Sequence, residues 1–233
     1  MSPGDPTGSP DVLFICSLMD GMGNDTIVFL ENQYLHLIGK KFGVEKKYDL
    51  NQLAITLAKQ EGLWCKGVYL YTAPPFQSEN PTDDEKRRKA GHDKFVSYMR
   101  RIPNFVVREG RCQKIDGEYH EKGVDALLTA DIVTLPYTHK NVKTIIILTC
   151  DTDFVPILNK MREEHGIRVI LYYYTDRQRE SKFSMSNVLH TACDKKVLLT
   201  KEHFEMSPYK HKSYPHSPPN PTSSERIKVK KDE

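Results

Sequence analysis

Short runs of β-branched and apolar residues alternate along the chain with segments whose apolar residues recur at helical spacing. The runs predict strands at 26–30, 68–72, 105–107, 144–149, 167–173 and 196–200. The run at 144–149 is the most apolar of the chain, as is typical of a strand buried on both faces. Strands separated by helices favour a parallel sheet. The pattern therefore predicts an α/β fold, with a mostly parallel central sheet flanked by helices.

The helices are predicted from apolar spacing, capping residues and helix-ending glycines and prolines. We expect them at about 35–42 and 50–61, ahead of Pro103, from about Lys122 and after Asp153, with 76–84 as a polar loop.

The length of 233 residues suits one α/β domain with tails. We expect a partly disordered leader at 1–24, the domain at 25–204, and a disordered, basic, proline-rich tail at 205–233. The tail has few apolar residues, so it cannot bury enough surface to offset the entropy of ordering it.

Composition narrows the class of protein only slightly. The net charge of +3 permits a nucleic-acid partner without arguing for one. No stretch approaches the ~20 apolar residues of a membrane span, so no membrane association is expected. Five scattered cysteines without a C-x-x-C pair indicate reduced thiols in a cytoplasmic protein. A homo-oligomer or a protein partner remains possible.

Acidic side chains follow the predicted strands. Glu31 and Asn32 follow the first strand, Asp151 and Asp153 follow the run at 144–149, and Asp125 lies in the first turn of a helix. Because ligands of parallel sheets bind at the carboxyl ends of the strands, the four carboxylates are expected to meet. Like charges this close repel unless a cation joins them, and an oxygen-only ligand set suits Mg²⁺ or Mn²⁺.

Each acid also has a simpler interpretation. Asp151 or Asp153 alone could cap the following helix. Asp125 could be a first-turn acid that interacts favourably with the helix dipole. Glu31 could be a charged residue exposed at the end of a strand. Asp131 falls within an apolar helical stripe, where a carboxylate needs a partner. That partner could be a loop backbone, a basic side chain or the acidic cluster.

Two motifs resemble the NYN domain, the LabA-like branch of the PIN-domain ribonuclease superfamily. They are Lys122-Gly123-Val124-Asp125, with Asp131 six residues later, and the segment LTCDTDFVP at 148–156. A closing element similar to S-x-x-L-x-x-x-A-D is present as Ser186, Leu189 and Asp194.

This resemblance implies a Rossmann-like PIN fold and a divalent-metal-dependent ribonuclease that leaves a 5′-phosphate and a 3′-hydroxyl. Mg²⁺ or Mn²⁺ would be held by Glu31, Asp125, Asp151 and Asp153. Asn32, Asp131 and Thr152 would lie just behind these ligands.

Two positions depart from the family pattern. Glu31 stands where the family usually has Asp, and Cys150 stands where the family has Gly. Glu31 is one methylene longer than Asp, so the metal would shift or the backbone would retract. Asn32 could take the place of an Asn that the family has near this acid. The Cys150 side chain could narrow the approach to Asp151.

Contacts to RNA phosphates would come from basic residues outside the acids. The candidates are Lys122, Arg87, Arg88, Arg177 and Arg179.

Two alternatives to a ribonuclease stay open. The D-x-D after a buried strand also occurs in haloacid-dehalogenase phosphatases, although little chain follows it here. The other is a catalytically weakened NYN-like module that binds RNA or a protein.

Overall fold

Six parallel strands form the central sheet, in the order β3-β2-β1-β6-β7-β8. The computed structural model describes residues 25–45, 47–176, 183 and 186–209. The strands are β1 (Asp25–Glu31), β2 (Trp64–Thr72), β3 (Phe105–Glu109), β6 (Thr144–Leu148), β7 (Arg168–Tyr173) and β8 (Lys195–Leu198). The α/β prediction is confirmed, and so is its mostly parallel sheet.

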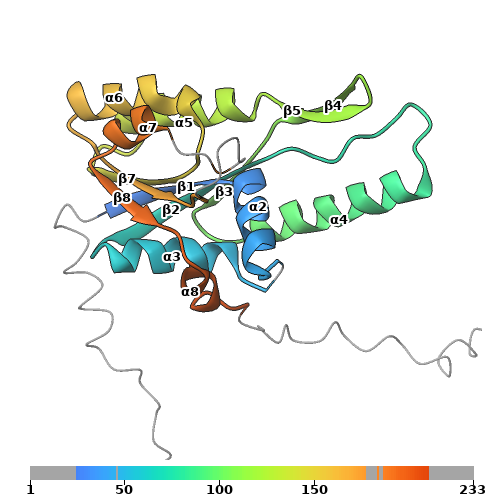
Figure 1. The fold of residues 1–233 in the computed structure, drawn as a ribbon, viewed down its shortest axis with the longest axis horizontal. Helices are drawn as coiled ribbons and strands as arrows, with labels where there is room; N and C mark the ends of the chain where they lie inside the picture. Colours follow the sequence, from blue (N-terminus) through green and yellow to red (C-terminus); the bar gives the residue numbers. More distant parts are fainter. Residues whose placement is uncertain (1–24, 46, 177–182, 184–185, 210–233) are drawn as a thin grey trace, which may run out of the picture.

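Helices cover both faces of this sheet (Figure 1). One face carries α2 (Asn32–Phe42), α3 (Leu50–Gln60), α4 (Asp83–Met99) and α8 (Lys201–Glu205). The other carries α5 (Val124–Thr138), α6 (Val155–Glu163) and α7 (Asn187–Thr191). Successive strand residues point to opposite faces. Val28 and Leu30 therefore join the core under α2 and α3, while Ile27 and Phe29 join the core under α5 and α6.

The helix expected from about Lys122 is present as α5 and begins at Val124. Residues before α5 form an antiparallel hairpin of β4 (Arg111–Ile115) and β5 (Glu118–Lys122), which projects from the domain in Figure 1. The strands of the hairpin carry mostly polar residues, so hydrophobic periodicity did not reveal them. Asp116-Gly117 at the turn, with φ of 50° and 86°, is the local signal that could have.

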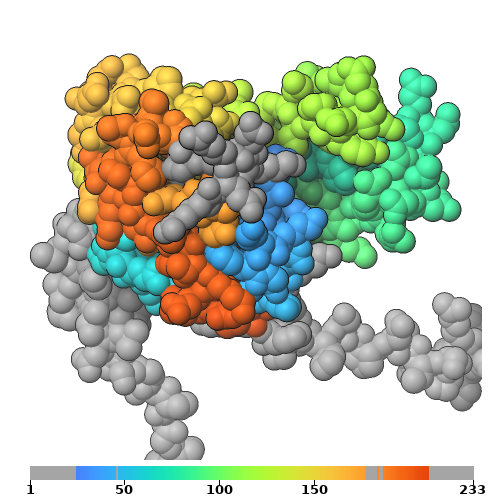
Figure 2. All heavy atoms as spheres, viewed as in Figure 1, coloured from blue at the N-terminus to red at the C-terminus, as the bar shows by residue number. Residues whose placement is uncertain are grey.

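The domain continues to residue 209, beyond the expected boundary at 204. Ser207 is fully buried, and its carbonyl accepts a hydrogen bond from the Asp49 N–H at 2.8 Å. Pro208 forms a β-bridge with Tyr48. In Figure 2 the orange segment that ends with α8 lies against the blue α2, where the Phe42 and Phe204 rings pack edge to face.

The sheet has a topological switch point between β1 and β6. From β1 the chain continues to β2 and β3 on one side, whereas β6, β7 and β8 extend the sheet on the other. Ligands of open α/β sheets bind outside the carboxyl ends of the strands at such a point. No described helix has the length and apolar character to cross a membrane.

Candidate active site

A hydroxyl group links the ends of β1 and β6 at the switch point. Glu31 is the last residue of β1, and its Oε2 accepts a hydrogen bond from the Thr149 hydroxyl at 2.8 Å. The Thr149 Oγ1 in turn accepts the Asp151 N–H at 3.0 Å. Thr149 therefore positions both acids. Sequence reasoning missed this role, although Thr149 lies within the segment LTCDTDFVP at 148–156.

Asp151 also caps the short helix η1 (Thr152–Phe154) that leads into α6. Its Oδ1 accepts the Asp153 N–H at 2.9 Å. Asp151 therefore does cap the helix that follows it. The cap uses one carboxylate oxygen and leaves the other for further contacts. Thr152 and Asp153 are exposed at the start of this turn.

The acids influence one another electrostatically. Burial raises the pKa of Glu31 to about 7; the Thr149 hydrogen bond opposes this rise, and the charges of Asp125 and Asp151 add to it. The pKa of Asp125, in the first turn of α5, is also raised, by desolvation and then by Asp151 and Asp153. The four predicted acids therefore share one neighbourhood at the edge of the sheet.

A fifth carboxylate comes from the hairpin. Glu121 on β5 is among the charges that raise the pKa of Glu31. The pKa of Glu121 is itself raised, by desolvation and then by the charge of Asp125. The nearby His92 opposes part of this rise. No motif marks Glu121 in the sequence, because its place depends on the β4–β5 hairpin.

The sequence profile of the NYN domain matches residues 25–199. The chain belongs to the NYN-domain family. This family is part of the PIN-like nuclease superfamily, whose members generally use divalent metals. Among solved structures, a Vibrio parahaemolyticus protein of unknown function is similar, with 16% identity, a TM-score of 0.50, and coverage of 78% of this chain and 96% of that one. This likeness supports the fold alone. No curated protein matches the chain.

The two departures from the NYN motif lie on different faces of the sheet. Glu31 joins the acids beside α5, whereas Cys150 packs against the core under α2 and α3. Burial raises the pKa of Cys150 to about 11, with smaller contributions from Glu31 and Asp151. The side chain at this position is therefore a neutral thiol in the metal-free protein.

The donor chemistry of the four candidate acids fits a hard divalent cation, since each would offer carboxylate oxygens. Desolvation is the main cause of the raised pKa values of Glu31 and Asp125, and the neighbouring carboxylates add a smaller rise that a cation would oppose. Within the described ranges, however, no three His, Cys, Asp or Glu side chains are gathered closely enough to hold a metal ion. The acids adjoin one another without forming a closed coordination shell.

Asp131 and Asn32 have partners outside the acid cluster. The Asp131 carboxylate accepts two hydrogen bonds from Arg108, both at 2.8 Å, and one from the Tyr71 hydroxyl at 2.9 Å. The basic side chain is thus the partner that Asp131 required. Asn32 donates from Nδ2 to the Thr72 hydroxyl at 3.1 Å.

The closing element of the NYN motif has structural contacts. Ser186 caps α7 by accepting the Val188 N–H. Asp194 accepts hydrogen bonds from Arg162 at 2.9 Å and from the Val169 N–H at 2.8 Å. These contacts tie α6, β7 and the segment before β8 together.

The basic candidates for RNA contact are dispersed. Lys122 ends the hairpin and is exposed near Asp125 in sequence. Arg87 and Arg88 lie on α4, and both pair with Asp84. Arg177 and Arg179 fall outside the described residues.

Proposed function

We propose that the chain is a divalent-metal-dependent ribonuclease that hydrolyses phosphodiester bonds of single-stranded or structured RNA. The observation that carries this proposal is the hydrogen-bonded chain from Glu31 through Thr149 to Asp151 at the switch point. Asp125 and Asp153 add their charges to the same edge. Glu31 and Asp151 are partly buried, and Asp125 and Asp153 are exposed. Carboxylates this near one another repel unless a cation is bound.

In this proposal the acids bind the metal ion, and their hydrogen-bond partners hold them in place. Glu31, Asp125, Asp151 and Asp153 would hold Mg²⁺ or Mn²⁺, and the ion when bound supplies an activated water and neutralises developing charge. Thr149 fixes the Glu31 carboxylate, and the cap on η1 fixes Asp151. Both acids are therefore oriented before substrate arrives, which lowers the cost of reaching a reactive geometry.

RNA would be held mainly through its phosphates. Lys122 at the end of β5 lies two residues from the start of α5, which suits a phosphate contact beside Asp125. The other candidates for phosphate contacts lie farther from Asp125 along the chain. They are Arg87, Arg88, Arg177 and Arg179. Phosphate contacts of this kind weaken as salt rises.

A binding module without cleavage is the second candidate. It is favoured by the lack of three closely gathered ligands in the described ranges and by Glu31 in place of the family's Asp. Metal-dependent RNA binding with no product from any RNA would select this alternative.

The test is the Asp151→Asn variant. Asparagine can still accept the Asp153 N–H, so the cap and the fold should persist. Mn²⁺-dependent cleavage of a labelled RNA should fall to background, whereas Asp83→Asn, the same change on the fully exposed first turn of α4, should leave it unchanged. A folded Asp151→Asn protein with full activity would refute the assigned site.

A further inference from the structure

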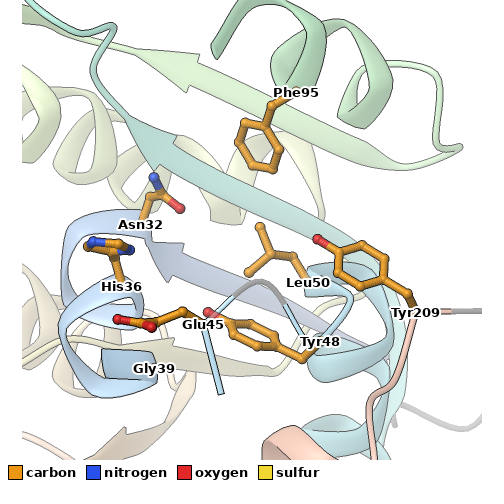
Figure 3. Close-up of a pocket in the computed structure, with 8 residues that line it drawn as sticks. All are labelled: Asn32, His36, Gly39, Glu45, Tyr48, Leu50, Phe95 and Tyr209. Carbon is orange, nitrogen blue, oxygen red and sulfur yellow. The ribbon is translucent and has the colours of Figure 1, made fainter. Parts of the chain in front are cut away.

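A hollow lies on the α2 side of the sheet. It is a pocket of about 170 Å³ formed by α2, the start of α3, α4 and the last described residue, Tyr209 (Figure 3). Its volume is suited to one small planar group rather than a folded partner. None of the motifs discussed above accounts for it.

Asn32 connects this pocket to the acids. It directly follows Glu31 in the chain, and its side chain lines the pocket. Its Nδ2 is engaged by Thr72, while its amide oxygen is directed toward the pocket in Figure 3. A strand whose phosphate lies at Glu31 would therefore have a neighbouring group at the pocket entrance.

The lining combines flat aromatic rings with hydrogen-bonding groups. Tyr48, Phe95 and Tyr209 supply the rings. Tyr48 is held in place by the Phe204 ring, at a centroid distance of 4.7 Å. His36 and Glu45 add polar groups from α2 and the turn after it. Rings with a few placed polar groups are typical of sites for planar heterocycles.

We propose that this pocket binds one unstacked nucleobase of the RNA strand, next to the phosphate at the acids. This inference rests on the proposed ribonuclease function. Aromatic faces stack on bases of any sequence. The Glu45 carboxylate repels phosphate but accepts hydrogen bonds from exocyclic amino groups. The pocket therefore takes the base rather than the backbone, and prefers adenine, guanine or cytosine to uracil.

Gly39 offers a way to fill the pocket without straining the helix. A Cβ on this α2 residue would meet Tyr48 at 3.7 Å and the Glu45 backbone at 3.9 Å, which are ordinary contacts. Gly39→Ala should thus be tolerated, whereas Gly39→Leu extends into the pocket. Gly91→Leu on α4, where a Cβ meets nothing within 4 Å, is the matched control outside the pocket.

The experiment measures binding of labelled oligoadenylate and oligouridylate in the Asp151→Asn background, where cleavage does not interfere. Gly39→Leu should weaken oligoadenylate binding about tenfold, because one stacked base is worth about 1–3 kcal/mol. Gly39→Ala and Gly91→Leu should bind like the parent. Glu45→Gln, an exposed change that cannot disturb the core, should reduce the preference for oligoadenylate over oligouridylate.

Thermal melting checks that Gly39→Leu is folded, and Glu45→Gln gives an independent test if it is not. Unchanged affinity in folded Gly39→Leu, or an unchanged base preference in Glu45→Gln, would overturn the pocket proposal while leaving the nuclease site intact. Conversely, base-dependent binding that Gly39→Leu abolishes, with no cleavage by the wild type, would uphold the pocket and refute the nuclease.

Discussion

Glu31→Gln should stabilise the metal-free protein at alkaline pH and have little effect at acidic pH. Burial raises the pKa of this carboxyl to about 7 in the folded state, from its ordinary value of 4.5 in the unfolded chain. Between these two values the folded chain holds a proton that the unfolded chain has released. The free energy of unfolding therefore falls as pH rises through this window.

The expected change in the free energy of unfolding follows from the difference between the folded and unfolded pKa values of Glu31. It corresponds to about 3 kcal/mol at pH 8 and less than about 1 kcal/mol at pH 5. Glutamine cannot ionise, yet its amide oxygen can still accept the hydrogen bond from Thr149. The substitution should thus remove the cost of burying the charge and keep the contact.

Urea denaturation in the presence of a chelator, at pH 5 and pH 8, measures this difference. Glu163→Gln, on the exposed end of α6, is the control and should match the wild type at both values. Adding Mn²⁺ should remove the advantage of Glu31→Gln at pH 8, because a bound cation favours the ionised carboxylate. An equal effect of Glu31→Gln at both pH values would refute the burial argument.

Three further outcomes are expected. Thr149→Val should lower the cleavage rate at least about tenfold, because Glu31 and Asp151 lose their common anchor; equal rates in a single-turnover assay would contradict this. Asp131→Ala should lower the free energy of unfolding by about 2 kcal/mol, because it leaves the buried Tyr71 hydroxyl without its acceptor, and calorimetry should show that Mn²⁺ affinity is kept. A chain ending at residue 209 should melt like the full-length protein, whereas one ending at 204 should melt several degrees lower, because it lacks the buried Ser207; indistinguishable melting curves would refute the docking of this segment.

Much of the fold could be predicted because hydrophobic spacing encodes it directly. The six strands of the sheet lie within a few residues of their predicted positions, since each is an apolar run bounded by polar turns. The hairpin could not be found in this way. It is exposed along most of its length, so no burial requirement shaped its sequence, and only the Asp116-Gly117 turn marks it.

The C-terminal boundary was misplaced for a related reason. Residues 205–209 hold few apolar groups, and composition alone suggests a solvated tail. They are held instead by backbone contacts, in which the Ser207 carbonyl bonds to Asp49 and Pro208 bridges to Tyr48. Pairing between backbones so distant along the chain leaves no periodic trace in the sequence.

The acids could be anticipated because each occupies a strand end or the first turn of a helix, positions that a parallel sheet brings to one edge. Thr149 and Glu121 could not be weighed, since their roles depend on side-chain direction and on the hairpin. The structure also separates the two departures from the NYN motif physically. Because side chains alternate along β6 and its extension, Thr149 faces the acids while Cys150 packs under α2 and α3. The longer Glu31 reaches across to Thr149 on the neighbouring strand, so the length of this side chain is matched by a partner of its own.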